Sequence, residues 1–149
     1  MNYTLKITKR SDFPEGIGQA EVVDFLYEHL DRFRDTKTSI SRALDYCFFT
    51  DAGKGGYLLL AMEDGKIVGA VVMNYTGMQG YIPENILVYI AVHNGKRGKG
   101  LGAQLIKEVL ANTEGSIALH VEYDNPAKRL YERLGFSTKY AEMRWQKEA

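Results

Sequence analysis

The sequence predicts an α/β fold with a mixed sheet, mostly antiparallel, that ends in a parallel β-α-β unit. Three observations indicate it. The chain has 149 residues and is 45% apolar, which suits one domain with one core. Two strand-like runs flank a tight-turn pair, which favours antiparallel pairing. A buried strand, a helix and a second strand follow each other over 86–123, and such strands pair in parallel through a right-handed crossover.

The N-terminal third shows one short strand and two helices. Apolar residues at helical spacing define both helices, and Thr38 or Ser39 is the expected N-cap of the second. The strand, a loop and the two helices are expected at Tyr3–Thr8, Ser11–Gly18, Gln19–Arg34 and Ile40–Phe48.

The middle of the chain predicts three strands. Tyr57–Glu63 and Lys66–Tyr75 flank Asp64-Gly65, a pair suited to the positive φ angles of a hairpin turn. After a glycine- and proline-containing loop at Thr76–Asn85, the run Ile86–Val92 is apolar without alternation. Such a run is typical of a strand covered on both faces, so helices are expected on both faces of the sheet.

The C-terminal third alternates helices and strands. A helical stripe runs from Leu101 to Leu110, and Ile117–Tyr123 alternates as a strand does. A short helix follows, with Asn125 as its cap, Pro126 at its first position and Gly135 past its end. The alternating tail predicts a last strand over Ser137–Lys147.

Composition limits the function classes. The formal net charge is zero, so no global field favours nucleic acid or a membrane surface. The single cysteine, Cys47, fits a reducing compartment and lies on an apolar stripe, where a core role is expected. No signal peptide is evident, and no apolar run approaches the roughly 18 residues that span a bilayer. We therefore expect one cytoplasmic domain over 1–149, without membrane or nucleic-acid partners.

The segment VHNGKRGKGLGAQLI, at 92–106, concentrates glycine and positive charge where a strand meets a helix. The first N–H groups of a helix lack intrahelical partners and attract anions. Glycine at 98, 100 and 102 removes Cβ atoms that would keep phosphates from the backbone. Neither the nucleotide P-loop nor the dinucleotide Gly-x-Gly-x-x-Gly spacing is present. A diphosphate is the expected ligand, and a solvated basic turn is the plain alternative.

Two motifs carry a resemblance to a known family. Arg-x-x-Gly-x-Gly at Arg97–Gly102, directly after Ala91-Val92, resembles the acetyl-CoA-binding motif of the GNAT superfamily of N-acetyltransferases. NPAKRLYERLGF at Asn125–Phe136 is similar to the second signature of that family. The resemblance implies the GNAT fold, in which the two parallel strands splay apart at the acetyl-CoA site.

The resemblance also implies how acetyl-CoA binds. The pyrophosphate would lie on backbone N–H groups of the glycine corner, and pantetheine would pair with the strand end. Asn125 would contact the pantetheine arm, cap its helix, or do both, and Lys128 would meet adenosine phosphates or remain on a solvated face. The implied contacts are Ala91, Val92, His93, Arg97, Gly98, Lys99, Gly100, Leu101, Gly102, Ala103, Asn125 and Lys128.

The resemblance indicates a general acid but no single general base. Tyr131 matches the general-acid tyrosine of the family, and its alternative role is packing beneath the helix. The early central strand lacks the glutamate or histidine that serves some family members as base. Glu84 and His120 are the candidate bases, with Glu122 and Tyr89 nearby and a water chain as the alternative.

Acceptor residues are expected from the helical pair and from the loop 76–85. Tyr75, Tyr81 and Tyr89 are candidates for an aromatic wall around an amine, or ordinary half-buried tyrosines. Acidic residues such as Glu28, Asp31 and Asp35 could bind a cation but are expected on a solvated helix face.

Taken with the resemblance, the sequence predicts an acetyl-CoA-dependent N-acetyltransferase that acts on a primary amine of a small molecule or peptide. The amine attacks directly in a ternary complex, no metal is required, and the protein is a monomer or homodimer. A non-catalytic acyl-CoA sensor is the alternative, and a nucleic-acid module is disfavoured by the neutral charge.

Overall fold

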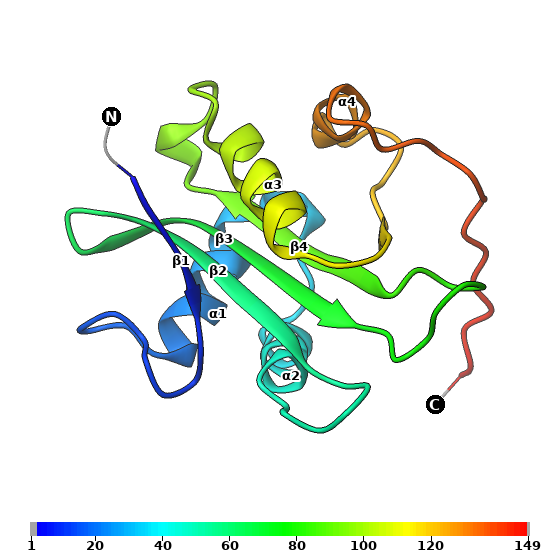
Figure 1. The fold of residues 1–149 in the computed structure, drawn as a ribbon. Coiled ribbons are helices and arrows are strands. Elements are labelled where there is room, and N and C mark those ends of the chain that lie inside the picture. The colour runs from blue at the N-terminus through cyan, green and yellow to red at the C-terminus, as the bar shows by residue number, and fades with distance from the viewer. Residues whose placement is uncertain (1–2, 149) are drawn as a thin grey trace.

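The computed structural model describes residues 3–148 and contains one five-stranded sheet in the order β1-β2-β3-β4-β5 (Figure 1). The first three pairings are antiparallel, and β4 pairs with β5 in parallel. This is the predicted mixed sheet. Its strands are β1 (Thr4–Thr8), β2 (Gly56–Glu63), β3 (Lys66–Tyr75), β4 (Asn85–Val92) and β5 (Ile117–Leu119).

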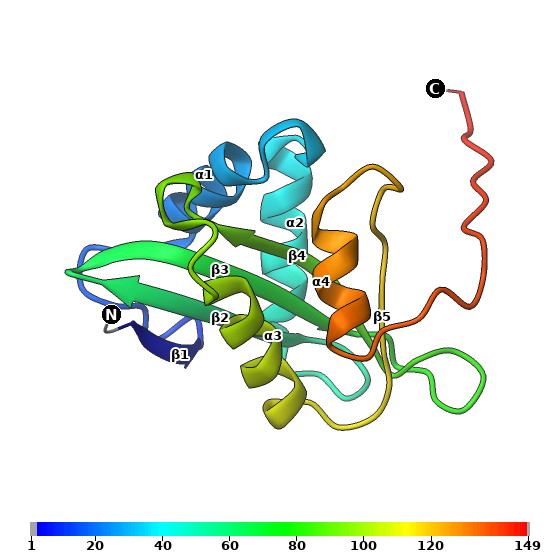
Figure 2. The ribbon, with the colours of Figure 1, turned by 90° about the horizontal axis from the view of Figure 1, so that it is seen from above.

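Helices cover both faces of the sheet, as expected (Figure 2). α1 (Gln19–His29) and α2 (Lys37–Cys47) pack on one face, in a core that includes Leu58 and Leu60 of β2. α3 (Leu101–Asn112) and α4 (Ala127–Arg133) lie on the other face, in a second core. Adjacent β2 residues alternate between the two cores, which explains why the strand reads as continuously apolar. No helix within residues 3–148 is long and apolar enough to cross a bilayer.

The β2–β3 hairpin is confirmed. Asp64 and Gly65 both have positive φ, 53° and 74°, as a tight turn between twisted strands requires.

A bulge in β4 opens the sheet. Val72 of β3 lies opposite Tyr89 and Met73 opposite Leu87, so Val88 is an extra residue in β4. β4 and β5 pair over only three residues, ending with Leu87 opposite Leu119. Past this point the described residues of the two strands form no ladder pairs, so the sheet has a seam with an unpaired main-chain edge on β4. This seam is the splay that the resemblance predicted.

The seam also explains why β5 is shorter than expected. The predicted strand ran to Tyr123, but its pairing stops at Leu119. Because β4 diverges after its bulge, residues 120–123 have no partner strand, although their sequence still alternates.

The connection between α1 and α2 differs from the prediction. The helix expected over 19–34 ends at His29, and a short 3₁₀ turn follows at Asp31–Phe33. Asp31 has φ of 59°, which Asp tolerates better than most residues. The N-cap of α2 is Thr36, whose hydroxyl accepts from the Ser39 N–H, and neither Thr38 nor Ser39 caps this helix.

The predicted last strand is not formed. Residues 137–148 have no regular secondary structure and run away from the body of the domain (Figures 1 and 2). Tyr140, Met143 and Trp145 are 80%, 91% and 83% exposed. Strand periodicity alone cannot form a strand when no ladder partner is within reach.

Candidate functional site

The glycine corner has the geometry of an anion site. Gly98 and Gly100 have φ of 79° and 86°, and a Cβ on either would meet no atom within 4 Å. The first bond of α3 runs from the Gln104 N–H to the Gly100 carbonyl, at 3.1 Å. The N–H groups of residues 101–103 precede it and are left for a ligand or water. These N–H groups lie at the N-terminus of α3, the positive end of the helix dipole, which favours an anion in the open space above the glycines.

Gly102 also has a packing role that the sequence did not indicate. A Cβ there would lie 3.2 Å from Leu130 Cδ2 and 3.9 Å from Val92 Cγ2. This glycine therefore allows α3 to approach α4 closely.

Of the three basic residues at the corner, two are engaged within the protein. Lys96 Nζ lies 2.7 Å from a carboxylate oxygen of Glu63. The Arg97 guanidinium donates to the carbonyls of His29 and Val92. Lys99 makes no side-chain hydrogen bond or ion pair with the described residues. The Arg97 side chain thus fastens the corner to the end of α1, while Lys99 is exposed.

A histidine pair supports the corner from the α1 side. His29 Nδ1 accepts from the Asn94 N–H at 3.1 Å, and His93 Nδ1 accepts from the Gly95 N–H at 3.0 Å. The two rings stack with centroids 4.2 Å apart. Burial lowers the pKa of His29, with a further contribution from His93, against an opposing effect of Glu28. His29 is a site residue that sequence reasoning missed, because its place on an apolar helical face indicated only a core position.

The seam adjoins this corner. Beyond Leu87, β4 continues through Ala91 and Val92 directly into it, and the side chain of Ala91 packs toward the α1/α2 core, that of Val92 toward the α3/α4 core. The main-chain edge of this segment faces residues 120–123 without pairing to them. Unpaired strand edges accept an added extended chain.

Tyr131 lies on the α4 side of the seam. Its side chain is 7% exposed, packs within the α3/α4 core, and lies 5.9 Å from the ring of Phe136. Burial raises the pKa of the phenol to about 12. The hydroxyl makes no hydrogen bond with the described residues, yet it is not among their fully buried unsatisfied atoms, so it keeps contact with solvent.

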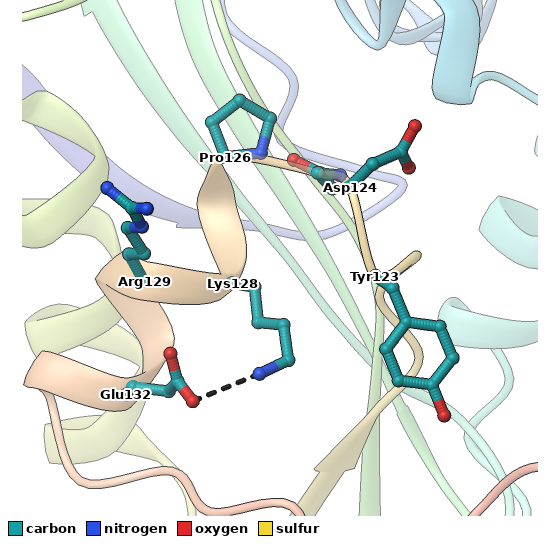
Figure 3. A pocket seen from close by; sticks show the side chains of 7 residues that line it. Tyr123, Asp124, Pro126, Lys128, Arg129 and Glu132 are labelled. Carbon is teal, nitrogen blue, oxygen red and sulfur yellow. Dashed lines mark hydrogen bonds and ion pairs between the residues drawn. The ribbon is translucent and has the colours of Figure 1, made fainter.

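The start of α4 lines a pocket of about 500 Å³ (Figure 3). Asn125 Oδ1 accepts from the Ala127 N–H at 2.9 Å, which is the capping interaction expected of this residue. Pro126 has helical dihedral angles at the first turn, and Gly135 follows the helix with φ of 105°. Lys128 projects into the pocket and pairs with Glu132 at 3.0 Å.

The two candidate bases differ in position. Glu84 accepts from the N–H groups of Ser116 and Gly80, at 2.7 and 3.2 Å, and these bonds lower its pKa. It therefore secures the paired end of β4 and β5, and a lowered pKa makes it a weaker base. His120 is exposed at the seam, and its neighbours Leu119 and Val121 pack toward the α3/α4 core. That alternation puts His120 on the α1/α2 side.

The three tyrosines do not form one wall. Tyr75, at the far end of β3, lies close enough to Tyr57 to affect the pKa of that residue, on the α3/α4 side. Tyr81 is 77% exposed in the β3–β4 loop. Tyr89 lies at the seam on the opposite face, and its hydroxyl donates to Asp35 Oδ2 at 2.6 Å. Only Tyr89 borders the unpaired part of β4.

The part of the chain from 3 to 148 holds no group of three or more His, Cys, Asp or Glu side chains suited to a metal ion. Cys47 is buried in the α1/α2 core, and burial raises the pKa of its thiol to about 12. Such a thiol is a core residue and no nucleophile.

Comparisons with known proteins agree with this geometry. Residues 54–138 match the model of the acetyltransferase (GNAT) domain family. A 5-NmdU N-acetyltransferase of Pseudomonas phage PaMx11 is 32% identical over 84 residues, which are 55% of this chain and 58% of that relative. The chain thus matches little more than half the length of this curated relative.

Solved structures share the fold. Aminoglycoside N-acetyltransferase AAC(6')-Iy, in complex with CoA, superposes with a TM-score of 0.70 at 14% identity, over 99% of this chain and 96% of that one. The ribosomal-protein-alanine N-acetyltransferase of Brucella melitensis biovar Abortus 2308 gives 0.68 at 18% identity, over 98% and 99%. The matched model covers the bulged strand, the glycine corner and the Tyr131 helix, and the chain belongs to the GNAT acetyltransferase domain family.

Proposed function

We propose that the protein is an acetyl-CoA-dependent N-acetyltransferase that acetylates a primary amine by direct attack in a ternary complex. The observation that carries this proposal is the continuity of the unpaired β4 edge with the α3 N–H groups that precede the first bond of that helix. One surface thus offers strand-type pairing to an extended arm and helix-end donors to a diphosphate.

Each part of acetyl-CoA has a matching element. The diphosphate would lie on the N–H groups of residues 97–103, where Gly98 and Gly100 leave open space. Pantetheine would pair with the edge at Ala91–His93. Lys99 and Lys128 are the cations available near the phosphates, and Asn125 keeps its amide nitrogen for the arm while its oxygen caps α4.

In this site the amine nitrogen attacks the thioester carbon, forming the C–N bond. A main-chain N–H near Val92 would stabilise the charge that develops on the carbonyl oxygen. As the C–S bond breaks, Tyr131 gives its hydroxyl proton to the leaving sulfur and recovers one from solvent. The attacking amine loses its proton to water at the seam, and the exposed His120 is the candidate side-chain base.

The protein would act in the cytoplasm, because the free, buried thiol of Cys47 fits a reducing compartment. The protein would act as a monomer or homodimer.

The direct test is release of free thiol from acetyl-CoA with a panel of primary amines: an aliphatic diamine, an amino acid, an aminoglycoside, a peptide N-terminus and 5-NmdU, the compound named for the phage relative. Amine-dependent release is expected with at least one class. Binding of CoA without release by any amine would instead identify a non-catalytic acyl-CoA binder.

Substitution at the corner tests the cosubstrate site. Gly100→Val is expected to reduce CoA affinity by at least about 100-fold in calorimetry, because its side chain would fill the space above the backbone donors. Its positive φ adds a strain of about 1–2 kcal/mol, which the domain should survive. Gly16→Val is the matched control, since Gly16 also has positive φ (78°) and no atom within 4 Å of a Cβ. Equal CoA affinity in Gly100→Val and the control would refute this site.

A further inference from the structure

The segment between α1 and α2, residues 31–36, lies across the seam on the face opposite α4. Asp35 accepts from Tyr89 of β4, at 2.6 Å. Arg32 pairs with Asp124, which follows β5, at 3.0 Å. One short segment therefore contacts both sides of the seam. Its side chains border the face by which an acceptor reaches the unpaired part of β4.

Asp35 is a carboxylate without a cation partner among the described residues. The basic residues around it in the sequence are engaged elsewhere. Arg32 pairs with Asp124, and the Arg34 guanidinium lies 4.0 Å from the ring centre of Tyr27. Lys37 pairs with Asp24 at 3.0 Å. These three cations have partners of their own, and Arg144 on the tail pairs with Glu142, so the exposed carboxylate of Asp35 has no ion-pair partner within residues 3–148 and can accept a cation from outside.

Tyr89 fixes where this carboxylate points. Burial, followed by the hydrogen bond to Asp35, raises the pKa of the phenol, so Tyr89 remains a neutral donor. One carboxylate oxygen is held by that donor and the other is left for a ligand. One further cation, Arg144 on the tail, lies within electrostatic range of this carboxylate, although its own ion-pair partner is Glu142. The pKa of Arg144 is raised mainly by Glu142 and also by Asp35, so a guanidinium is already within the field of Asp35.

We infer that Asp35, oriented by Tyr89, binds a positively charged group of the acceptor other than the amine that is acetylated. The carboxylate stands one tyrosine side chain away from the β4 backbone, where the thioester would lie. It is therefore placed to hold the far end of an acceptor while the near amine, which must be uncharged to attack, reaches the seam. The acceptor class is a dicationic amine. This inference rests on the proposed function for the identity of the reaction, but the binding it predicts can be measured without turnover.

Binding of two matched probes tests this site. With CoA present, calorimetry is expected to show that 1,4-diaminobutane binds about fivefold more tightly than butylamine, a preference worth about 1 kcal/mol. Asp35→Asn should remove that preference while leaving CoA affinity unchanged. Tyr89→Phe should reduce it, because the carboxylate loses its orienting donor. Asp31→Asn is the control on the same segment and should keep it.

Four outcomes separate this inference from the proposed function. Equal affinity of the wild-type protein for the two probes overturns the inference, and so does a preference that survives in Asp35→Asn. If CoA does not bind, the proposed function fails, and the same pair of probes is then compared on the free protein. Thiol release from acetyl-CoA with the monoamine alone as substrate supports the proposed function and overturns the dicationic acceptor.

Discussion

Tyr131 combines a buried ring with a hydroxyl that keeps contact with solvent. Burial favours the neutral phenol and raises its pKa to about 12. A free thiol has a pKa near 8.5, so proton transfer from this phenol to a fully solvated thiolate would be unfavourable. A thiolate formed within the seam would itself be desolvated, and desolvation raises its proton affinity. Burial therefore makes the Tyr131 phenol a weaker acid, but it also makes the leaving thiolate a stronger base.

Removing the Tyr131 hydroxyl should affect the chemical step and leave binding intact. Tyr131→Phe keeps the ring in the α3/α4 core and is expected to lower kcat by about 100-fold, within the range typical of a positioned acid. CoA affinity should stay within about twofold of wild type. Steady-state kinetics with calorimetry checks both. An unchanged kcat would leave Tyr131 with a packing role alone.

The pH dependence should reflect the raised pKa of Tyr131. Since the folded protein favours the neutral phenol, the acid remains protonated up to about pH 10. The kcat should rise as the amine loses its proton and show no fall below pH 10. A fall in kcat below pH 10 that is absent from Tyr131→Phe would contradict the raised pKa of Tyr131.

The end of α1 is joined to the glycine corner by two hydrogen bonds, one of which requires a neutral imidazole. His29 accepts from the Asn94 N–H, and the His29 carbonyl accepts from Arg97. Burial lowers the pKa of His29 below its ordinary value of 6.5. The unfolded chain then binds a proton more readily than the folded one. This contribution to stability is complete above pH 6.5 and is lost as the pH falls through the lower pKa of the folded state.

Replacing His29 should remove part of the acid sensitivity of the fold. The unfolding free energies of wild type and His29→Gln, measured by urea titration between pH 7.5 and 5, should differ most at pH 7.5. The difference should shrink toward pH 5, because glutamine does not titrate. A difference that grows on acidification would mean that His29 is stabilised in its charged form.

Local sequence signals predicted most elements but not the positions where neighbouring elements decide the outcome. Asp64-Gly65 determines its turn locally, and the apolar run of β4 needs no partner to be recognised. The extra residue Val88 arises from register against β3, which no pattern within β4 reveals. Residues 120–123 and the tail both keep strand alternation, yet neither has a strand to pair with.

The candidate site shows the same division. The backbone donors of the glycine corner follow from glycine spacing beside a strand, and they were predicted. Asp35 was noted as a possible cation ligand but assigned to a solvated helix face. The helix ends earlier, at His29, and the left-handed Asp31 redirects the chain toward β4. Aspartate adopts this conformation at low cost without glycine, so the sequence carried no signal for the turn.

Two hydrophobic cores, one on each face of the sheet, stabilise the domain, and residues 137–148 contribute to neither. Residues 137–148 expose their aromatic side chains and form no regular structure. Deletion from Ser137 onward is therefore expected to shift the thermal midpoint by less than about 2 °C, as is usual when no core contact is lost. Scanning calorimetry, with light scattering for molecular mass, checks this. A larger fall, or a change of mass, would show that the tail packs against a second copy.

At the seam between β4 and β5 the described part of the sheet lacks main-chain hydrogen bonds past Leu87. On the proposed function, the acyl donor would supply them. An arm paired with Ala91–His93 would replace the missing strand contacts, and a ligand at 100 times its Kd adds about 2.7 kcal/mol to the folded state. Loaded protein should then resist proteolysis and heat better than empty protein. An enzyme built in this way is partly held together by the metabolite it consumes, so its lifetime in a cell would follow the supply of that metabolite.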